Sequence, residues 1–334
     1  MPAFSSESIS AARSHAADAV PLALGIDIGG TKVAAGVVDG HGVIVEELRR
    51  VTPGRDARAV EQVIVDLVAE LGSRHAIESV GIGAAGWMDL DGARVVFSPH
   101  LAWRDEPLRD TLEAMLHRPV LVTNDADAAA WAEARFGAGQ GHSRMIMLTL
   151  GTGIGGALVL DGKVERGAFG MAGEFGHQII MPGGHRCECG NRGCWEQYAS
   201  GNALGREARE LAGKQSPMAA ALLAAVDGRA EEITGTVVTD LALQGEATSK
   251  ELIAEVGDWL GLGMANLAAA LDPALFVIGG GLSAAGELLL EPARRAYSRN
   301  LTGRGYRKEA AIEEAQLGAA AGLIGAADLS RARR

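Results

Sequence analysis

One stretch of the chain, from Gly173 to Glu196, concentrates side chains that bind metals and hydroxyl groups. It contains all three cysteines of the protein, Cys187, Cys189 and Cys194, and His177 stands ten residues before the first of them. Three thiolates and one imidazole complete the tetrahedral shell of a structural zinc ion, which leaves no open position for catalysis. His185 is a competing ligand, because it lies two residues before the first cysteine. Without a metal, the cysteines would pack as small buried side chains and the glycines would only form turns.

Two carboxylates flank these ligands, Glu174 before the histidine and Glu196 after the last cysteine. Carboxylates that accept hydrogen bonds from neighbouring hydroxyl groups give charge-assisted and geometrically selective binding. Since a metal would order the loop between them, we expect the two acids to bind a hydroxylated substrate. His177 would serve both partners, with one ring nitrogen on zinc and the other as a hydrogen-bond donor.

A second polar pair, Asn124 and Asp125, directly follows the apolar run 119–123 and opens an expected helix. Asp125 can act as a general base on a substrate hydroxyl, while Asn124 hydrogen-bonds the neighbouring hydroxyl. Asparagine and aspartate are also common helix N-caps, so the spacing alone supports both roles. Asp127 is a rival base, but two residues into the helix it is better placed to complement the helix dipole.

Three glycine-rich turns follow apolar runs of strand length. Backbone N–H groups in such turns can cradle phosphate oxygens, and a carboxylate at the strand end can hold a hydrated Mg²⁺. The first two could also be plain hairpin turns, and neither a Walker-A pattern nor a dinucleotide fingerprint is present. The third precedes an expected helix and suits a nucleotide base or ribose. The candidate nucleotide residues are Asp27, Gly29, Gly30, Thr31, Lys32, Gly151, Thr152, Gly153, Gly279, Gly280 and Gly281.

The elements that must position these residues follow an alternating order. Strands are expected over 22–28, 32–39, 43–52, 79–86, 119–123, 144–150, 154–160 and 274–280, and helices over 57–71, 107–117, 124–139, 249–273, 285–299 and 318–330. The opening pattern of strand, glycine turn and strand recurs at 144–160, and both copies end in Asp-Gly. This repeat indicates two similar domains that face each other, unless the short match is coincidental. We therefore expect an α/β protein of two lobes.

Length and composition narrow the functional classes. The 334 residues suit about two domains, and the net charge of −11 argues against nucleic acid and against an anionic membrane surface. No apolar run is long enough for a membrane span. Three closely spaced cysteines do not form a secreted disulfide framework, so we expect a reducing, cytoplasmic location. Residues 1–20 lack the features of a signal peptide and are expected to form a flexible extension.

Several of these motifs together resemble the ROK family of repressors and sugar kinases. They are DIGGTK, GIGAAGWMD, the ND pair, LGTGIGG, and GEFGH followed by CECGNRGCWE, and the resemblance covers residues 22–330. Within the family, the chain looks most like a bacterial ATP-dependent glucokinase. The resemblance implies the actin-like, hexokinase-type ATPase fold (a duplicated ribonuclease H-like domain) with a cleft between lobes. The lobes would be 21–139 with the C-terminal helix 316–330, and 140–315 with a zinc loop at 177–194.

The resemblance also assigns roles. Asp125 would be the base on the sugar 6-hydroxyl; Asn124, Glu174, His177, Glu196 and the backbone at Gly86 would bind glucose or a related hexose. His177 and the three cysteines would hold Zn²⁺, the glycine turns would bind ATP with Mg²⁺, and a homodimer or homotetramer is implied. Two departures from the family pattern are Ala85, where many members have proline, and His100, where asparagine is common.

Three classes of protein remain as alternatives. Kinases for mannose, fructose or N-acetylglucosamine share the motifs. ROK regulators also share the zinc motif, but they need a helix-turn-helix that residues 1–20 do not supply. In a zinc-finger interaction module, the cysteine loop would contact a partner protein. The acidic charge and the second glycine hairpin argue against that module.

Overall fold

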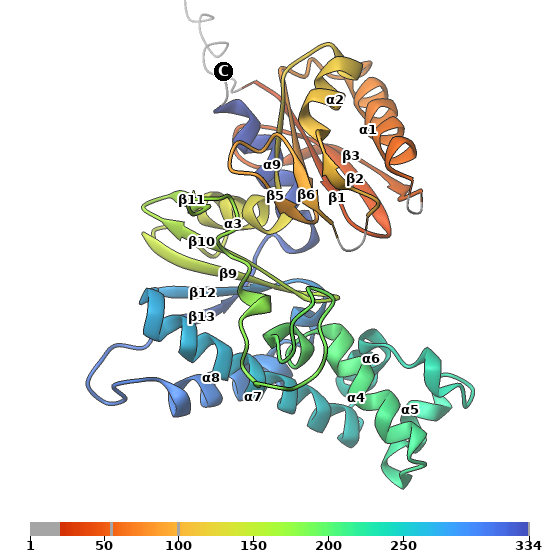
Figure 1. Cartoon of the computed structure of the whole chain (residues 1–334), viewed down its shortest axis with the longest axis vertical. Helices are drawn as coiled ribbons and strands as arrows, with labels where there is room; N and C mark the ends of the chain where they lie inside the picture. The colour runs from red at the N-terminus through yellow and green to blue at the C-terminus, as the bar shows by residue number, and fades with distance from the viewer. Residues whose placement is uncertain (1–20, 54–55, 99–100, 333–334) are drawn as a thin grey trace, which may run out of the picture.

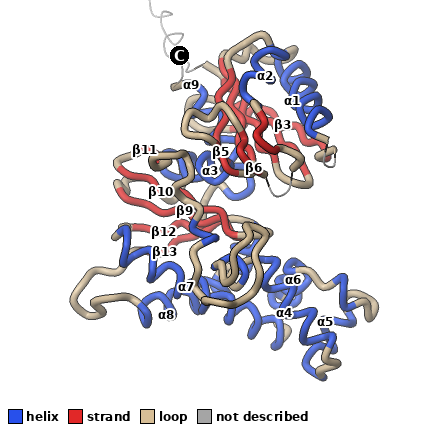
Figure 2. The backbone as a smooth tube through the Cα atoms, viewed as in Figure 1, coloured by secondary structure: helices blue, strands red, loops and turns tan. Residues whose placement is uncertain are grey.

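The computed structural model describes residues 21–53, 56–98 and 101–332. The expectations for residues 1–20 and His100 lie outside these ranges. Within the described residues the strands form two five-stranded sheets, ordered β3-β2-β1-β4-β8 and β11-β10-β9-β12-β13. Each sheet forms the centre of one half of the molecule, and helices cover the faces of both (Figures 1 and 2).

The strands of the first sheet are β1 (Ala23–Ile28), β2 (Lys32–Val38), β3 (Ile44–Val51), β4 (Ser79–Ala84) and β8 (Val120–Asn124). Those of the second are β9 (Arg144–Leu150), β10 (Ile154–Leu160), β11 (Lys163–Glu165), β12 (Leu275–Gly279) and β13 (Ala311–Glu314). The helices are α1 (Ala57–Gly72), α2 (Leu108–Leu116), α3 (Asp125–Phe136), α4 (Gly201–Gly213), α5 (Ala220–Ala224), α6 (Gly235–Leu243), α7 (Ala247–Leu271), α8 (Glu287–Asn300) and α9 (Ala321–Arg331).

The predicted repeat is confirmed by strand pairing. Each sheet begins, in chain order, with an antiparallel hairpin: β1 with β2 in the first, and β9 with β10 in the second. In each, the first strand of the hairpin also pairs in parallel with the next strand of the sheet, β4 or β12. Because both hairpin turns follow the same kind of strand in the same topology, they occupy equivalent positions in the two halves.

Three apolar cores hold the layers together. Alternate side chains of β1, such as Leu24 and Ile26, point toward α1 and α2. The opposite faces of the two sheets enclose α3 and α9, where the buried residues are mostly alanine. The second sheet packs its outer face on helices α4, α6, α7 and α8. The order across the molecule is therefore helices, sheet, α3 with α9, sheet, helices.

The central helix layer is thin because small residues let backbones approach closely. A Cβ atom on Gly325 of α9 would lie 1.8 Å from the carbonyl oxygen of Ala128 in α3. A Cβ on Gly25 of β1 would lie 1.9 Å from the carbonyl oxygen of Leu323. Neither position can hold a side chain without moving a helix. This layer fixes the start of α3, and therefore Asp125, between the two sheets.

A third, three-stranded sheet lies beside the first and was not predicted from the sequence. It comprises β5 (Trp87–Met88), β6 (Val95–Phe97) and β7 (Arg104–Glu106). Its strands are two or three residues long, too short for a periodicity signal. The expected strand 79–86 is correspondingly shorter and ends at Ala84, so that Gly86 lies in the connection to β5. Within the described part of the chain, no helix is long and apolar enough to cross a membrane.

Candidate active site and zinc cluster

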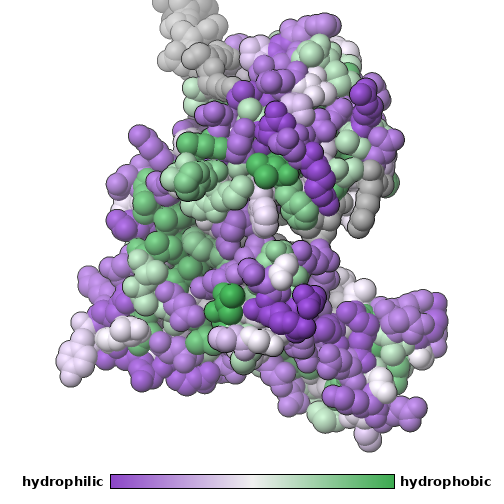
Figure 3. Space-filling view, viewed as in Figure 1, coloured by the Kyte–Doolittle hydropathy of each residue, from purple (hydrophilic) through white to green (hydrophobic). Residues whose placement is uncertain are grey.

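A cleft lies between the two halves, and the space-filling view shows the surface hollowed there (Figure 3). It brings together residues that are far apart in the sequence. The predicted site residues that line it are Gly29, Gly30, Gly86, Asn124, Asp125, Gly151, Thr152, Gly153, Glu174, His177, Glu196 and Gly280. Ala85, the first departure from the family pattern, lines it as well, and its carbonyl oxygen accepts a hydrogen bond from the Ser98 hydroxyl at 2.7 Å.

Asn124 and Asp125 lie where β8 ends and α3 begins. Asn124 caps the helix, because its side-chain oxygen accepts hydrogen bonds from the backbone N–H groups of Ala126 and Asp127 at 2.8 and 3.1 Å. Its Nδ2 donates to the carbonyl oxygen of Gly86 at 3.0 Å. The capping alternative is therefore realised for Asn124, and the cap holds the Gly86 wall of the cleft in place. Asp125 follows the cap and lines the cleft.

Asp127, the rival base, lies apart from the cleft. Its side chain is buried and lies 3.4 Å from the guanidinium of Arg166. Burial raises the pKa of Asp127 to about 7, while Arg166 lowers it and Asp125 raises it further. Successive residues of a helix are rotated by about 100°, so Asp125 and Asp127 point to nearly opposite sides. This geometry favours Asp125 as the carboxylate that meets a ligand in the cleft.

The first glycine turn contributes to the cleft through Gly29 and Gly30, whereas Thr31 and Lys32 are exposed. Asp27 is partly buried near the end of β1. Burial and the nearby Asp125 raise the pKa of Asp27 to about 7, and Lys32 partly opposes the shift. A buried carboxyl of this kind would be ionised readily beside a bound cation, as a Mg²⁺ site requires.

The second and third glycine turns follow β9 and β12, which are neighbouring parallel strands of the second sheet. Gly280 has a φ of +87°, and a Cβ there would lie 2.5 Å from the backbone of Leu150. Gly279 is packed within the sheet, where a Cβ would lie 2.9 Å from the Met147 side chain. Gly281 lines a separate cavity, together with Gly151 and Thr152. The turns therefore connect the cleft to this second cavity.

The far wall of the second cavity comes from α6 and the residue before it. Its lining there includes Thr234, Gly235, Thr236, Thr239 and Asp240. No sequence motif marks these residues as part of a site. They carry hydroxyl and carboxylate groups, but they belong to an ordinary helix start, with Thr234 as its N-cap. Such a start has no distinguishing spacing, and only the fold brings it opposite Gly281.

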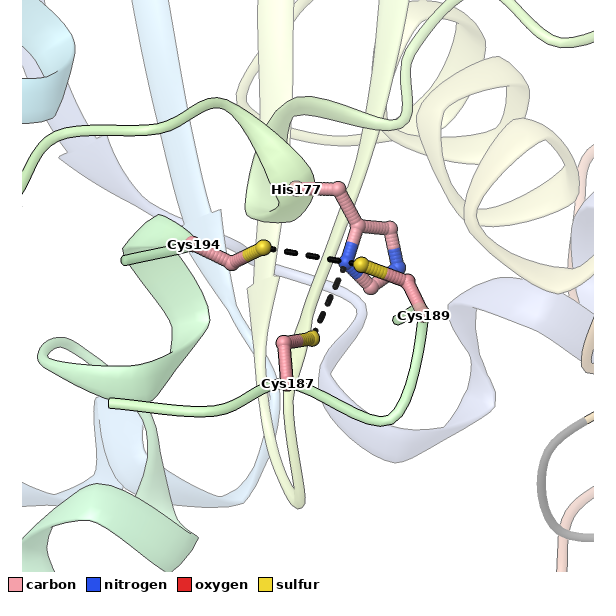
Figure 4. A group of neighbouring side chains, drawn as sticks. All are labelled: His177, Cys187, Cys189 and Cys194. Carbon is pink, nitrogen blue, oxygen red and sulfur yellow. Dashed lines mark hydrogen bonds between the residues drawn. The ribbon is translucent and has the colours of Figure 1, made fainter. Parts of the chain in front are cut away.

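His177, Cys187, Cys189 and Cys194 form one cluster, whose ligand atoms all lie within 4.8 Å of one another (Figure 4). The Sγ atoms of Cys189 and Cys194 are 3.6 Å apart, and Cys187 Sγ lies 3.6 Å from His177 Nδ1. A tetrahedral zinc with bonds of about 2.0–2.3 Å places its ligand atoms about 3.5–3.8 Å apart. The donor set and its spacing therefore fit zinc.

Without a bound cation, the surroundings of the thiols disfavour their charged form. Burial raises the pKa of the Cys194 thiol to about 11, and burial together with Glu196 also raises the pKa of the Cys187 thiol. Bonding to a cation would offset this cost, since the ligand form is the thiolate. His185 lies outside the cluster: its ring packs against Tyr198, and its Nε2 is 4.0 Å from Glu207.

His177 faces both the cluster and the cleft. Its Nδ1 points to Cys187, and its Nε2 lies 3.9 Å from the carboxylate of Glu174. Glu196 lies on the cluster side, with Oε1 3.0 Å from Cys187 Sγ and 3.6 Å from His177 Nδ1. Burial raises the pKa of Glu174, and His177 lowers it. The cluster therefore fixes the positions of two residues that line the cleft.

A further cavity adjoins the cleft beyond His177 and Glu196. Its additional walls are Phe97 from the small sheet and Arg186, Glu188 and Gln197 from the cysteine loop. Trp87 lines both spaces, and its ring lies edge-on to His177 at 6.1 Å between centroids. Trp87 lies in the GIGAAGWMD motif, but an aromatic residue after a glycine does not by itself predict a binding role.

Comparison with known proteins gives a consistent result. The family model described as "ROK family" matches residues 23–333. A glucokinase of Streptomyces coelicolor is 46% identical over 314 residues, which cover 93% of this chain and 98% of that protein. A ROK family glucokinase from Streptomyces griseus, solved with glucose and AMPPNP, superposes with a TM-score of 0.87 at 48% identity and covers 93% of this chain and 99% of that one. A xylose repressor of Caldicellulosiruptor bescii is 32% identical over 77% of this chain and 65% of its own length.

Proposed function

This chain belongs to the ROK family and has its two-domain, actin-like sugar-kinase fold, and we propose that it is an ATP-dependent glucokinase. It would transfer the γ-phosphoryl group of ATP to the 6-hydroxyl of glucose. One observation carries this proposal: a single cleft holds Asp125, the glycine turns of both halves, and the pair Glu174 and Glu196. The similarity to glucokinases over nearly the whole chain supports it.

In the proposed reaction Asp125 accepts the proton of the 6-hydroxyl as that oxygen attacks. Asn124 fixes the start of α3, and the remaining hydroxyls meet Glu174, His177 and Glu196. Backbone N–H groups at the first two turns surround the phosphates and stabilise charge on the transferring group. Mg²⁺ would supply charge neutralisation on the phosphates when bound, and the Asp27 carboxylate at the end of β1 would hold it. The adenosine would occupy the cavity between Gly281 and α6.

The zinc cluster has a structural part in this proposal. Four protein ligands close the coordination shell, so the metal shapes the loop and does not touch the reacting atoms. Thiolate ligands persist in a reducing compartment, which supports a cytoplasmic location.

The two sheets and their helices support lobes of 21–139 with 316–330, and of 140–315. Exposed apolar side chains such as Phe169 and Ile179 support assembly into a homodimer or homotetramer.

The choice of hexose depends on the wall at Trp87 and Phe97. The base must meet the 6-hydroxyl, so the opposite end of the sugar points toward His177 and the adjoining cavity. Substituents on that end, such as a 2-acetamido group, would enter this space. N-acetylglucosamine and mannose are therefore the competing substrates to compare with glucose.

The test is release of ADP by the purified protein with ATP, Mg²⁺ and a panel of hexoses. We expect ADP release to depend on sugar and the product to be glucose 6-phosphate, identified by mass spectrometry. ATP hydrolysis without sugar is the control. Sugar binding by calorimetry without any ADP release would instead indicate a sugar-binding regulator, the class to which the similar xylose repressor belongs.

A further inference from the structure

Arg166 makes a set of contacts that the proposed mechanism does not use. It follows β11 in the second half of the molecule, and its side chain is 19% exposed. Its Nη1 donates to the carbonyl oxygen of Leu90 at 2.8 Å, and its Nη2 donates to that of Asp89 at 2.9 Å. Its Nε lies 3.4 Å from Oδ2 of Asp127. One guanidinium therefore joins three segments: β11, the turn between β5 and β6, and the first turn of α3.

Each of these attachment points lies next to a wall of the cleft. Asp127 is two residues after Asp125 in the same helical turn. The turn at Asp89 and Leu90 directly follows β5, which begins with Trp87. Arg166 therefore holds the first turn of α3, which carries Asp125, from the side away from the cleft. It also holds the hairpin of β5 and β6, which carries Trp87.

The packing around this contact is tight. A Cβ on Gly170 would lie 2.7 Å from the carbonyl carbon of Asp89, so the segment after Arg166 touches the hairpin backbone directly. Arg166 and Asp127 line a cavity with Leu121, Val122 and Trp131 that shares no residue with the sugar cleft. Arg166 can therefore affect the reaction only through the residues it holds.

We propose that Arg166 is a positioning residue for phosphoryl transfer, which locks the Asp125 turn and the Trp87 hairpin onto the second half of the molecule. This inference rests on the proposed function. The planar fork of arginine suits the task, since it donates to two adjacent carbonyl oxygens while its charge faces a carboxylate. A displacement of about 1 Å at a reacting group can lower the rate about 100-fold.

The test separates positioning from stability with three variants, all compared at pH 8. In Arg166→Met we expect kcat to fall about 10- to 100-fold, with the KM for ATP nearly unchanged. The melting temperature should also drop by about 5–10 °C, because Asp127 is left buried without a partner charge. In Asp127→Asn/Arg166→Met the buried charge is gone, so the melting temperature should return toward wild type while kcat stays low. Arg166→Lys should keep the melting temperature and show an intermediate kcat.

Arg109→Met is the matched control. Arg109 donates to the carbonyl oxygen of Asp91 at 3.1 Å, in the same turn, but from α2 on the same side of the cleft. Its loss should leave kcat within about twofold of wild type, because it does not link the two halves. Full recovery of kcat in the double variant, or an equal loss in Arg109→Met, would overturn the positioning role.

Hydrogen exchange provides a readout that does not depend on activity. Amides at 86–90 and 125–127 should exchange faster in Arg166→Met than in Arg109→Met. If the wild type shows no sugar-dependent ADP release, the proposed function fails, and the exchange comparison still decides whether Arg166 holds these two segments. Unchanged exchange in both segments would refute the inference directly.

Discussion

Loss of zinc should weaken sugar binding far more than nucleotide binding. The perturbation is Cys189→Ser, because Cys189 is the partly exposed cysteine of the cluster, while Cys187 and Cys194 are buried. Serine keeps the size of the side chain but is not a zinc ligand of the usual set. The substitution therefore removes the metal with the least direct damage to the apolar core.

The expected loss of sugar affinity follows from the two proposed sugar-binding residues that the cluster positions, His177 and Glu196. His177 is itself a cluster member, and Glu196 follows the cluster member Cys194 by two residues, so loss of the metal should release the position of His177 and loosen that of Glu196. A hydrogen bond to a charged group contributes about 1.5–3 kcal/mol. Loss of two such bonds weakens sugar binding by about 3–6 kcal/mol, or about 10²- to 10⁴-fold. The cavity at Gly281 and α6 lies outside the loop, so AMPPNP affinity should change less than about threefold.

Three measurements decide the matter: zinc content by mass spectrometry, and the affinities for glucose and for AMPPNP by calorimetry. His185→Ala is the control, since His185 lies in the same loop but outside the cluster. It should keep its zinc and its affinity for glucose. A Cys189→Ser protein that retains a full zinc content would refute the ligand set. A zinc-free protein that binds glucose as tightly as wild type would refute the claim that the metal positions His177 and Glu196.

Three further predictions concern single residues. Asp125→Asn should lower kcat by about 10²- to 10⁴-fold with little change in sugar affinity, because only the proton acceptor is lost; steady-state kinetics that show near-normal turnover would exclude Asp125 as base. Burial raises the pKa of Asp27 from 3.8 to about 7, so the native state keeps a proton that the unfolded chain releases, and stability is lost as pH rises through this window. Asp27→Asn removes that loss, and its unfolding free energy relative to wild type should rise by up to about 4 kcal/mol between pH 4 and pH 8 in urea titrations without Mg²⁺; a constant difference would contradict the burial argument. Gly325→Ala should destabilise the fold by about 1–3 kcal/mol in urea unfolding, because its Cβ would lie 1.8 Å from the Ala128 carbonyl oxygen; an unchanged midpoint would show that the α3–α9 contact is looser than the structure indicates.

The strongest sequence predictions rest on local patterns. The two hairpins, the position of α3 and the four members of the zinc cluster follow from apolar periodicity, glycine turns and cysteine spacing, and the structure places them as expected. The structure places His177 in this cluster and His185 outside it. These features involve residues close enough in the sequence to constrain one another directly.

Contacts between distant segments could not be predicted in this way. The α6 wall of the second cavity meets Gly151 and Gly281, which lie about 85 residues before it and about 45 after it in the sequence. Arg166 meets Asp89 and Asp127 across the boundary between the halves. Neither set has a motif, because each residue type is ordinary in its own segment. Only the packing of two duplicated sheets around α3 and α9 makes these residues neighbours.

The two ring nitrogens of His177 explain why a structural metal belongs so close to the proposed substrate. Nδ1 lies 3.6 Å from Cys187 Sγ, and Nε2 lies 3.9 Å from the Glu174 carboxylate. A zinc ion on Nδ1 would fix the ring orientation and leave the proton on Nε2, so this nitrogen would be held as a donor toward the cleft. Any substitution at position 177 removes both functions at once and cannot separate them. The contribution of the metal to sugar recognition can therefore be measured only at a cluster member that does not reach the sugar itself, which makes Cys189 the informative position.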